Sequence, residues 1–255
     1  MRHRRKLLKC GIDLLDYVDD DDSDYAHLTL DESDPRWPAV SRLFPPEEVL
    51  DNITNTFDEF ELANASFLRF KSQSFTGFPQ PEDDFGYLKL TYDLSQYCDE
   101  CGMGALQNAP FRLIGEPKWG RRATFQTHWV PDAIFIRPDI YQAVFEPFAI
   151  GSWPVLTKSG KLLEGVLQLK LETLVSVSPA RDLPQQRCKK CKRERFLPFR
   201  RGFAPQPEPT DTHAFLSQQW FGVAHASDRL MYVSQALYQK MKEYKLNCEF
   251  SPCQK

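Results

Sequence analysis

Hydrophobic and polar residues follow helical spacing in one early stretch of the chain and strand spacing after it. The helical pattern comes after Pro45 and Pro46, and its apolar members are Val49, Leu50, Ile53, Phe57 and Phe60. Proline is tolerated in the first turn of a helix, and acidic residues such as Glu47 and Glu48 favour the positive end of the helix dipole. The spacing therefore predicts one amphipathic helix over residues 47–60.

Residues 65–92 predict extended chain. Phenylalanines separated by polar residues occur at Phe67, Phe70, Phe75 and Phe78. Leu88-Lys89-Leu90 then alternates apolar and polar side chains, which predicts a strand that leads toward the first cysteine pair. The helix and these strands together indicate α+β structure.

The middle of the chain predicts a strand, a helix and a hairpin in that order. Ile134-Phe135-Ile136 has the pattern of a short buried strand, and Arg137-Pro138-Asp139 has the pattern of a helix start. A hairpin is expected over 155–171, with its turn at 158–161. That turn lacks the first glycine and the hydroxyl residue of a phosphate-binding loop, so no nucleotide site is predicted there.

The C-terminal part has the same order of elements. Met231-Tyr232-Val233 predicts a strand, Ser234 is a good helix N-cap, and the helical stripe consists of Leu237, Tyr238, Met241 and Tyr244. A shift of 97 positions aligns Tyr141 with Tyr238 and Glu146 with Glu243, whereas the cysteine pairs are offset by 90. We hypothesise a tandem duplication of a strand–CxxC–strand–helix unit over 85–165 and 166–255.

The predicted organisation is therefore an acidic N-terminal region with one helix (1–84) and a double-CxxC, zinc-binding α+β domain (85–255). The composition of 42% hydrophobic and 26% charged residues is typical of a globular protein. No run of about 18 apolar residues occurs, so no membrane span is expected. The basic N-terminus leads into an acidic tract rather than an apolar one, which argues against a secretory signal and predicts a cytoplasmic protein.

Ten acidic side chains lie between residues 13 and 34, and no Lys or Arg falls between Lys9 and Arg36. Such a run is usually a solvated, loosely ordered segment. The alternative is an electrostatic patch for a basic partner, and its candidate partner-binding residues are Asp19, Asp20, Asp21, Asp22 and Asp24.

Two CxxC pairs are the strongest chemical signal in the sequence. They are Cys98-Asp-Glu-Cys101 and Cys188-Lys-Lys-Cys191. Two such turns supply the four thiolates of a closed tetrahedral zinc site, which is structural because no position stays open for water. A compact zinc ribbon separates its pairs by roughly 15 to 20 residues, whereas 86 residues intervene here. The alternatives are redox chemistry, or cysteines with no metal and no special role.

The second pair lies in a basic stretch with interleaved phenylalanines. Residues 187–203 include Lys189, Lys190, Lys192, Arg193 and Arg195. A nucleic-acid-binding zinc ribbon has this composition. The alternative is an exposed basic loop, or one that pairs with the acidic tract, and the overall net charge of −3 favours it.

No catalytic set is recognisable in the sequence. His128 and His225 are isolated, and neither GxSxG nor HExxH occurs. His128 beside Trp129 is interpreted as a core or interface residue rather than a general base. We therefore expect a protein that is not an enzyme.

Cys98-Asp-Glu-Cys101-Gly102, Cys188-Lys-Lys-Cys191 and the closing strand–helix up to Pro252 together resemble the double-CxxCG motif proteins, a family expanded in myxobacteria. The resemblance covers roughly residues 85–255, and Lys192 stands where the second glycine is expected. Some members of that family are immunity proteins. The resemblance thus implies an antitoxin that binds and neutralises a cognate toxin protein, with aromatic anchors among Trp37, Trp119, Trp129, Trp153 and Trp220. The competing prediction is a zinc-containing protein that binds nucleic acid through residues 187–203. The sequence leaves the oligomeric state open.

Overall fold

The chain divides into two compact units, Met1–Ile53 and Thr54–Lys255. The computed structural model describes residues 11, 17–19, 26–40, 42, 54–179, 183–199 and 201–253. In the first unit it describes the antiparallel strands β1 (Tyr17–Asp19) and β2 (Ala26–Leu28) and the short helix α2 (Trp37–Val40). The predicted partner-binding residues Asp20, Asp21, Asp22 and Asp24 lie outside the described residues, and Asp19 is described only by its backbone.

The helix predicted over 47–60 is wrong in its described part. Residues 54–58 are not helical, and helix α3 covers Glu59–Asn64. Asp58 caps it, because its carboxylate accepts from the Glu61 amide at 2.7 Å while Glu61 accepts from the Asp58 amide at 2.8 Å. This reciprocal cap fixes the start of the helix, and Phe60, which the prediction placed against a core, is 75% exposed.

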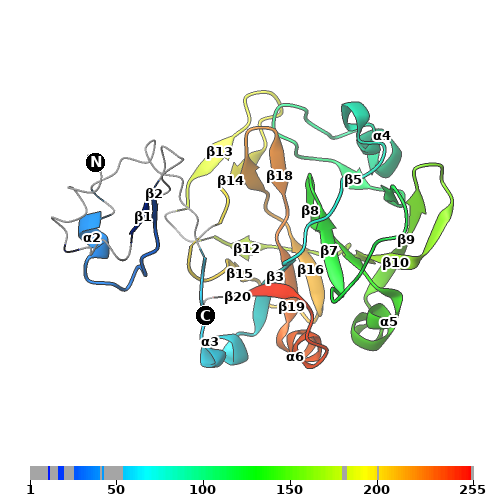
Figure 1. Ribbon diagram of the computed structural model, residues 1–255. Coiled ribbons are helices and arrows are strands. Elements are labelled where there is room, and N and C mark those ends of the chain that lie inside the picture. The colour runs from blue at the N-terminus through cyan, green and yellow to red at the C-terminus, as the bar shows by residue number, and fades with distance from the viewer. Residues whose placement is uncertain are drawn as a thin grey trace. The chain divides into compact units, whose positions relative to one another are not determined.

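The second unit contains two five-stranded sheets (Figure 1). The strands of the first sheet, in spatial order, are β6 (Arg112–Leu113), β9 (Gly151–Thr157), β10 (Leu162–Lys170), β8 (Val130–Ile136) and β7 (Thr124–Thr127). β6 pairs with β9 in parallel, and the other neighbours are antiparallel. The predicted strand at 134–136 and the predicted hairpin are both confirmed.

The second sheet is built from both ends of this unit. Its strands, in spatial order, are β11 (Leu174–Val175), β16 (Ala214–Ser217), β19 (Met231–Ser234), β3 (Phe67–Ser72) and β20 (Cys248–Pro252). β3 lies between β19 and β20 and is antiparallel to both. The compact unit consequently begins at Thr54 rather than at residue 85, since the C-terminal strands need β3 to complete their sheet.

Short strands surround these sheets. A four-stranded sheet contains β13 (Gln185–Arg187), β14 (Glu194–Phe196), β17 (Phe221–Val223) and β18 (Ala226–Asp228). Two further pairs are β4 (Tyr92–Asp93) with β5 (Leu106–Gln107) and β12 (Val177–Ser178) with β15 (Gln206–Pro207).

The strand predicted at Leu88–Leu90 is wrong, because these residues lie in helix α4 (Tyr87–Thr91), which follows the short 3₁₀ helix η3 (Asp83–Phe85). Tyr87 and Thr91 are both buried, and residues four apart share one helix face. Leu90 is 41% exposed. Burial of Tyr87 and Thr91 on one face therefore favours the helix, and the apolar–polar alternation over only three residues was too short to predict a strand.

Each large sheet has the same strand plan. In the first, β8 runs through a helical segment to β9, and β10 lies between the two strands. That helical segment consists of α5 (Pro138–Ile140), the π-helical η4 (Tyr141–Phe145) and the 3₁₀ helix η5 (Glu146–Phe148). In the second, β19 runs through helix α6 (Gln235–Glu243) to β20, and β3 lies between them. The predicted segments at 132–148 and 228–245 are thus each a strand followed by a helix.

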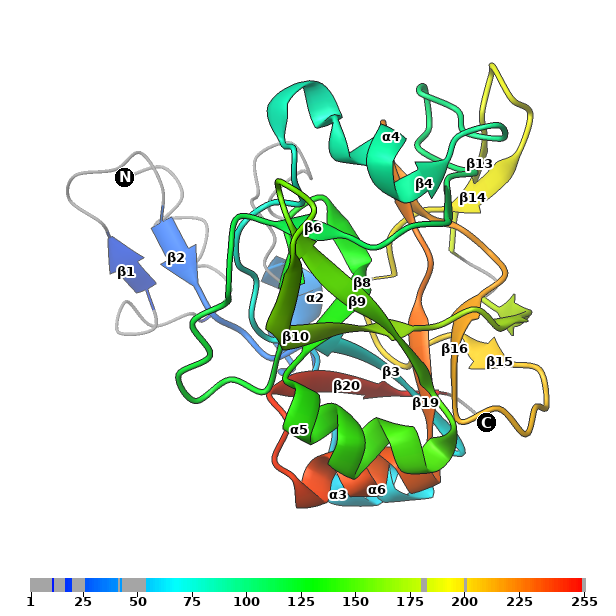
Figure 2. The ribbon, with the colours of Figure 1, turned by 90° about the vertical axis from the view of Figure 1, so that its right-hand side faces the viewer.

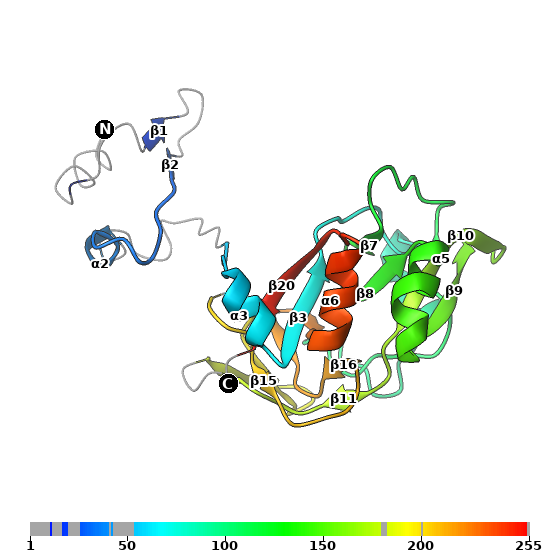
Figure 3. The same ribbon diagram turned by 90° about the horizontal axis from the view of Figure 1, so that it is seen from below.

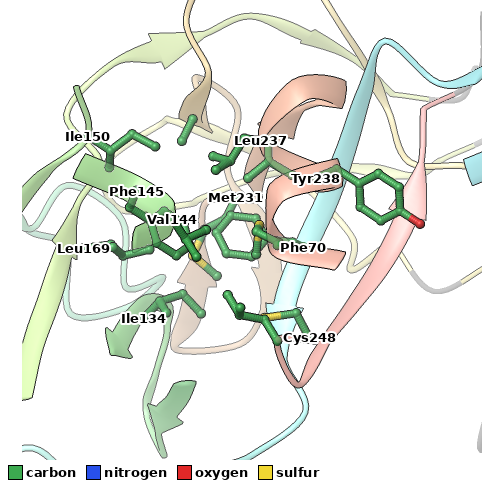
Figure 4. Packing of buried hydrophobic residues seen from close by; sticks show 14 of the residues in the cluster. Phe70, Ile134, Val144, Phe145, Ile150, Leu169, Met231, Leu237, Tyr238 and Cys248 are labelled. Atoms are coloured by element: carbon green, nitrogen blue, oxygen red, sulfur yellow. The ribbon is translucent and has the colours of Figure 1, made fainter. Parts of the chain in front are cut away.

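The two helical segments share one core with both sheets (Figure 3). Figure 4 shows Val144 and Phe145 from η4 in one cluster with Leu237 from α6, with Phe70 beside Val144 and Ile134 below it. Ser234 caps α6 as predicted, since its hydroxyl accepts from the Leu237 amide at 3.3 Å. Phe70, Ile134 and Leu237 are each at most 1% exposed. Of the predicted helical stripe, Leu237, Tyr238 and Met241 do face this common interior, whereas Tyr244 is 40% exposed.

Asn247 is one of the residues that join the two sheets where β7 approaches β3, together with Ser72 and Gln126. The Asn247 side-chain oxygen accepts from the amides of Ala123 at 2.9 Å and Thr124 at 3.2 Å. Its NH₂ group donates to Ser74 Oγ at 3.0 Å and to the Thr124 carbonyl at 3.1 Å. All donors and acceptors of this amide are satisfied, two of them by backbone of the buried Thr124.

Replacing Asn247 with Ala should lower the free energy of unfolding by about 2 kcal/mol or more, because it leaves the buried Ala123 and Thr124 amides without acceptors. Denaturant unfolding would measure the change. Asn64→Ala is the matched control, since Asn64 donates only to the exposed Phe60 carbonyl on α3, and it should cost less than about 0.5 kcal/mol. Equal losses in the two variants would contradict this role of Asn247.

Candidate metal centre

The first CxxC turn lies between β4 and β5. The Cys98 amide donates to the Met103 carbonyl at 2.9 Å, and the Gly102 amide donates to the Cys98 carbonyl at 2.7 Å. Gly102 has a left-handed backbone with φ of +77°. A Cβ atom at this position would collide with the backbone carbonyl of His225, so both the conformation and the space require glycine.

The second CxxC turn lies between β13 and β14 and repeats this geometry. The Cys188 amide donates to the Arg193 carbonyl at 2.9 Å, and the Lys192 amide donates to the Cys188 carbonyl at 3.1 Å. Lys192 has φ of +63°. It therefore adopts the left-handed conformation of Gly102 without being glycine, and the missing second glycine does not alter the turn.

The two turns bring four sulfur atoms together, with β4, β13 and β14 close to one another in Figure 2. The Sγ atoms of Cys98 and Cys188 lie 3.8 Å apart, and those of Cys101 and Cys191 lie 3.7 Å apart. All four sulfurs lie within 4.8 Å of one another. A tetrahedral site with metal–sulfur bonds of about 2.3 Å has sulfur–sulfur edges of about 3.8 Å, so the four cysteines could hold a metal ion.

An apolar shell surrounds the inner side of this cluster. Cys98 and Cys101 are buried, Met103 is fully buried, and Trp220 packs against the group. The ring of Trp220 in turn lies under the Arg229 guanidinium, 4.2 Å from its carbon to the ring centre. Cys188 and Cys191 are only partly buried, so one side of the cluster faces outward.

Basic side chains of the second turn bind the first turn. Lys190 forms an ion pair with Asp99 at 2.5 Å. Arg193 donates to the Gln96 carbonyl, and Gly104, with φ of +95°, leaves the room that this guanidinium occupies. Lys192 donates to the Lys189 carbonyl at 2.6 Å. Most of the predicted nucleic-acid-binding residues thus have partners within the two turns.

Arg195, another predicted nucleic-acid-binding residue, is 8% exposed. Its guanidinium donates to the Ala224 carbonyl at 2.8 Å, to Ser227 Oγ at 2.9 Å and to the Cys101 carbonyl at 3.2 Å. Ser227 Oγ donates to that same carbonyl at 2.7 Å. Arg195 therefore fixes the first turn against β18. The sequence could not predict this role, because a buried structural arginine and an exposed arginine that binds nucleic acid differ only in burial.

The thiols of the cluster differ in acidity. Burial raises the pKa of Cys101 to about 12. Amide N–H groups of Cys191 and Lys190 lower the pKa of Cys188 to about 7, although partial desolvation opposes them. A bound cation favours the thiolate form of its ligands.

A second group of perturbed side chains lies near a cavity of about 130 Å³ lined by Arg69, Asp228 and Arg229. Burial and the nearby Asp132 raise the pKa of Asp228 to about 8, and burial also raises the pKa of Asp132. Arg229 donates to the Ser217 and Gln218 carbonyls at 2.6 Å. Arg69 opposes the rise in the pKa of Asp228, and Arg229 opposes the rise in the pKa of Asp132, but burial outweighs both.

Of the five tryptophans that the sequence suggested as anchors, Trp129 is exposed (45%), whereas the other four are half-buried. Trp119 donates to the Gly165 carbonyl at 2.9 Å, and Trp153 lies under the Lys170 ammonium at 4.8 Å. His128 is exposed beside Trp129. The sequence could not distinguish the exposed Trp129 from the four half-buried tryptophans, since the exposure of a side chain depends on tertiary packing.

No protein-family model, curated protein or solved structure matches this chain. Among the described residues, no helix is both long and apolar enough to cross a membrane.

Replacing Cys188 with Ser should destabilise the fold and remove bound metal, because metal binding to such sites contributes on the order of 10 kcal/mol and is coupled to folding. Metal analysis and thermal unfolding would measure both effects. A chelator should lower the Tm of the wild type but not that of Cys188→Ser. Cys253→Ala is the control, since Cys253 lies outside the cluster, and it should keep one metal ion per chain. If purified wild-type protein contains no metal and a chelator does not change its Tm, the four cysteines do not form a metal site.

Replacing Lys192 with Gly should raise the free energy of unfolding by about 0.5–1 kcal/mol, since glycine adopts the left-handed conformation without the strain of a Cβ atom. Denaturant unfolding of the metal-loaded protein would measure it. Gly102→Lys is the reciprocal variant and should be strongly destabilising, because of the His225 carbonyl. If Lys192→Gly lowers the free energy of unfolding, the contacts of the lysine side chain contribute more to stability than relief of the backbone strain would.

Proposed function

We propose that this chain is an immunity protein that binds and neutralises a cognate toxin protein in the cytoplasm, with a structural four-cysteine zinc site. The observation that carries the proposal is the pair of matching CxxC turns on one sulfur cluster. The equivalent conformations of Gly102 and Lys192 support the resemblance to the double-CxxCG proteins at the one position where the motif departs from it.

Zinc is the metal we propose for the cluster. Four thiolates with near-tetrahedral spacing are its typical structural ligand set. Four ligands leave no open coordination position for water or substrate. The zinc would therefore hold Cys98 and Cys101 to Cys188 and Cys191 and would have no part in chemistry.

Toxin neutralisation needs a rigid surface rather than a catalytic set. Asp132 and Asp228 interact with Arg229 and Arg69 respectively. We propose that the protein is not an enzyme, because the sequence contains no recognisable catalytic set. The acidic tract at 19–24 would attract a basic toxin and increase the association rate.

We also propose that the two halves arose by duplication of one unit. Each half has a CxxC hairpin, then a strand that pairs with the next, a helix and a further strand. β6 pairs in parallel with β9, and Ala204 bridges in parallel to Cys253 just after β20. In the second half β3 takes the place of β10. The second half also contains the β17–β18 hairpin before β19, in the interval where the offset between the halves rises from 90 to 97.

Co-expression with the product of the neighbouring gene tests the proposed function. The wild-type protein should rescue cells from a toxin encoded there and should co-purify with it in a stable complex. Neutralising Asp19, Asp20, Asp21 and Asp22 to Asn should slow association and flatten its salt dependence, with less effect on dissociation. Failure to rescue, together with salt-dependent binding to RNA or DNA that needs Lys189 and Lys190, would overturn the proposal in favour of a nucleic-acid-binding zinc protein.

A further inference from the structure

A continuous row of aromatic rings lies at one end of the first sheet. Ring centres lie 6.0 Å apart for Phe75 and His128, and 5.0 Å apart for His128 and Phe78. Trp129 lies 4.5 Å from Phe78 and 4.7 Å from Phe85. Phe75, Phe85 and Trp129 are 45%, 53% and 45% exposed. We call these five residues the aromatic row.

Two members of the aromatic row are held in a strained backbone conformation. Trp129 is the second residue of the two-residue connection between β7 and β8, and its φ is +72°. Phe85 has φ of +52°. Bulky residues rarely adopt this region, and retained strain of this kind tends to occur at functional sites. A glycine would adopt the Trp129 turn without this strain, but the Trp129 ring also packs against Phe78, Phe85 and Tyr87.

The faces of these rings carry no cation from the described part of the chain. Elsewhere Lys170 lies over Trp153, Arg229 over Trp220 and Lys240 over Tyr244. No Lys or Arg among the described residues lies over Phe75, Phe85 or Trp129 in this way. Aromatic faces attract ammonium and guanidinium groups, most strongly for tryptophan.

Three carboxylates lie next to Phe85 of the aromatic row in the sequence. Glu82, Asp83 and Asp84 precede Phe85 in the chain, and all three are exposed. Asp83 forms an ion pair with Lys158 at 3.6 Å, and the side chains of both residues are exposed. Glu82 and Asp84 are exposed and lie within three residues of Phe85, so a cationic side chain of a partner would meet carboxylates and a ring face on one short segment.

We propose that the aromatic row is the docking surface for a partner protein that presents arginine or lysine side chains, with Trp129 as the anchor. Trp129 combines an exposed apolar area with neighbouring rings that hold it in place, as binding hot spots do. Under the proposed function, this partner is the toxin. The proposal deepens that function because it assigns the surface, and it differs from the acidic tract at 19–24.

The test uses the full chain labelled with 5-fluorotryptophan and a synthetic arginine–glycine peptide as the probe. Fluorine NMR gives one resonance per tryptophan, and Trp129→Phe assigns the resonance of interest. We expect the peptide to shift the Trp129 resonance saturably and to leave those of Trp153 and Trp220 in place, since their rings already carry cations. A glutamate–glycine peptide should shift none of them.

Charge variants keep the test independent of any effect of Trp129 on folding. Glu82→Gln with Asp84→Asn should weaken peptide binding at least threefold. The matched control, Glu208→Gln with Asp211→Asn, changes the net charge equally on other exposed residues and should leave binding unchanged. An unmoved Trp129 resonance, or equal effects of the two variants, would overturn the proposal. A larger response to oligothymidylate than to the arginine peptide would also overturn it, because stacked bases would then be the better ligand.

The rescue assay separates this proposal from the proposed function. If the wild type rescues cells and Trp129→Ala does not, the surface is supported, provided that Trp153→Ala still rescues. If Trp129→Ala rescues as well as the wild type, the aromatic row is not the docking surface for the toxin, and the proposed immunity function stands. If the wild type fails to rescue, the immunity function fails, and the peptide measurements still decide whether the row binds cations.

Discussion

The meeting of four sulfur atoms is the constraint on which the rest of this structure depends. Cys98 and Cys101 come from one hairpin and Cys188 and Cys191 from another, and their sulfurs lie within 4.8 Å of one another. For that to happen, the intervening chain must leave the cluster, build one whole sheet and return. A metal ion at this point would cross-link segments far apart in sequence. It would stabilise the fold because it binds the assembled cluster and not the unfolded chain.

The surroundings of the cluster are arranged to keep the two turns in place. Lys190 pairs with Asp99, Arg193 reaches the Gln96 carbonyl, and the buried Arg195 binds the Cys101 carbonyl. These cations also offset the charge that four thiolates would bring together. A basic segment that composition alone would assign to nucleic acid is thus largely occupied within the protein.

The proposed docking surface and the stabilising contacts involve different residues of the second unit. The sulfur cluster, the shared helical core and the Asn247 seam hold the sheets together. The aromatic row adds exposed rings and positive φ angles at Trp129 and Phe85, which cost stability rather than supply it. Backbone strain that is retained beside exposed aromatic rings is readily explained by a partner.

The sequence by itself determined the elements whose signals are local. The strand at 134–136, the hairpin after it, the Ser234 cap and the identity of the four clustered cysteines all follow from periodicity, capping chemistry and CxxC spacing. Tertiary structure alone decided that β3 completes the C-terminal sheet, that Leu88–Leu90 is helical and that Arg195 is buried while Trp129 is exposed. The physical reason is the same in each case: strand partners and burial depend on contacts between residues distant in sequence, and no local pattern encodes which of those contacts wins.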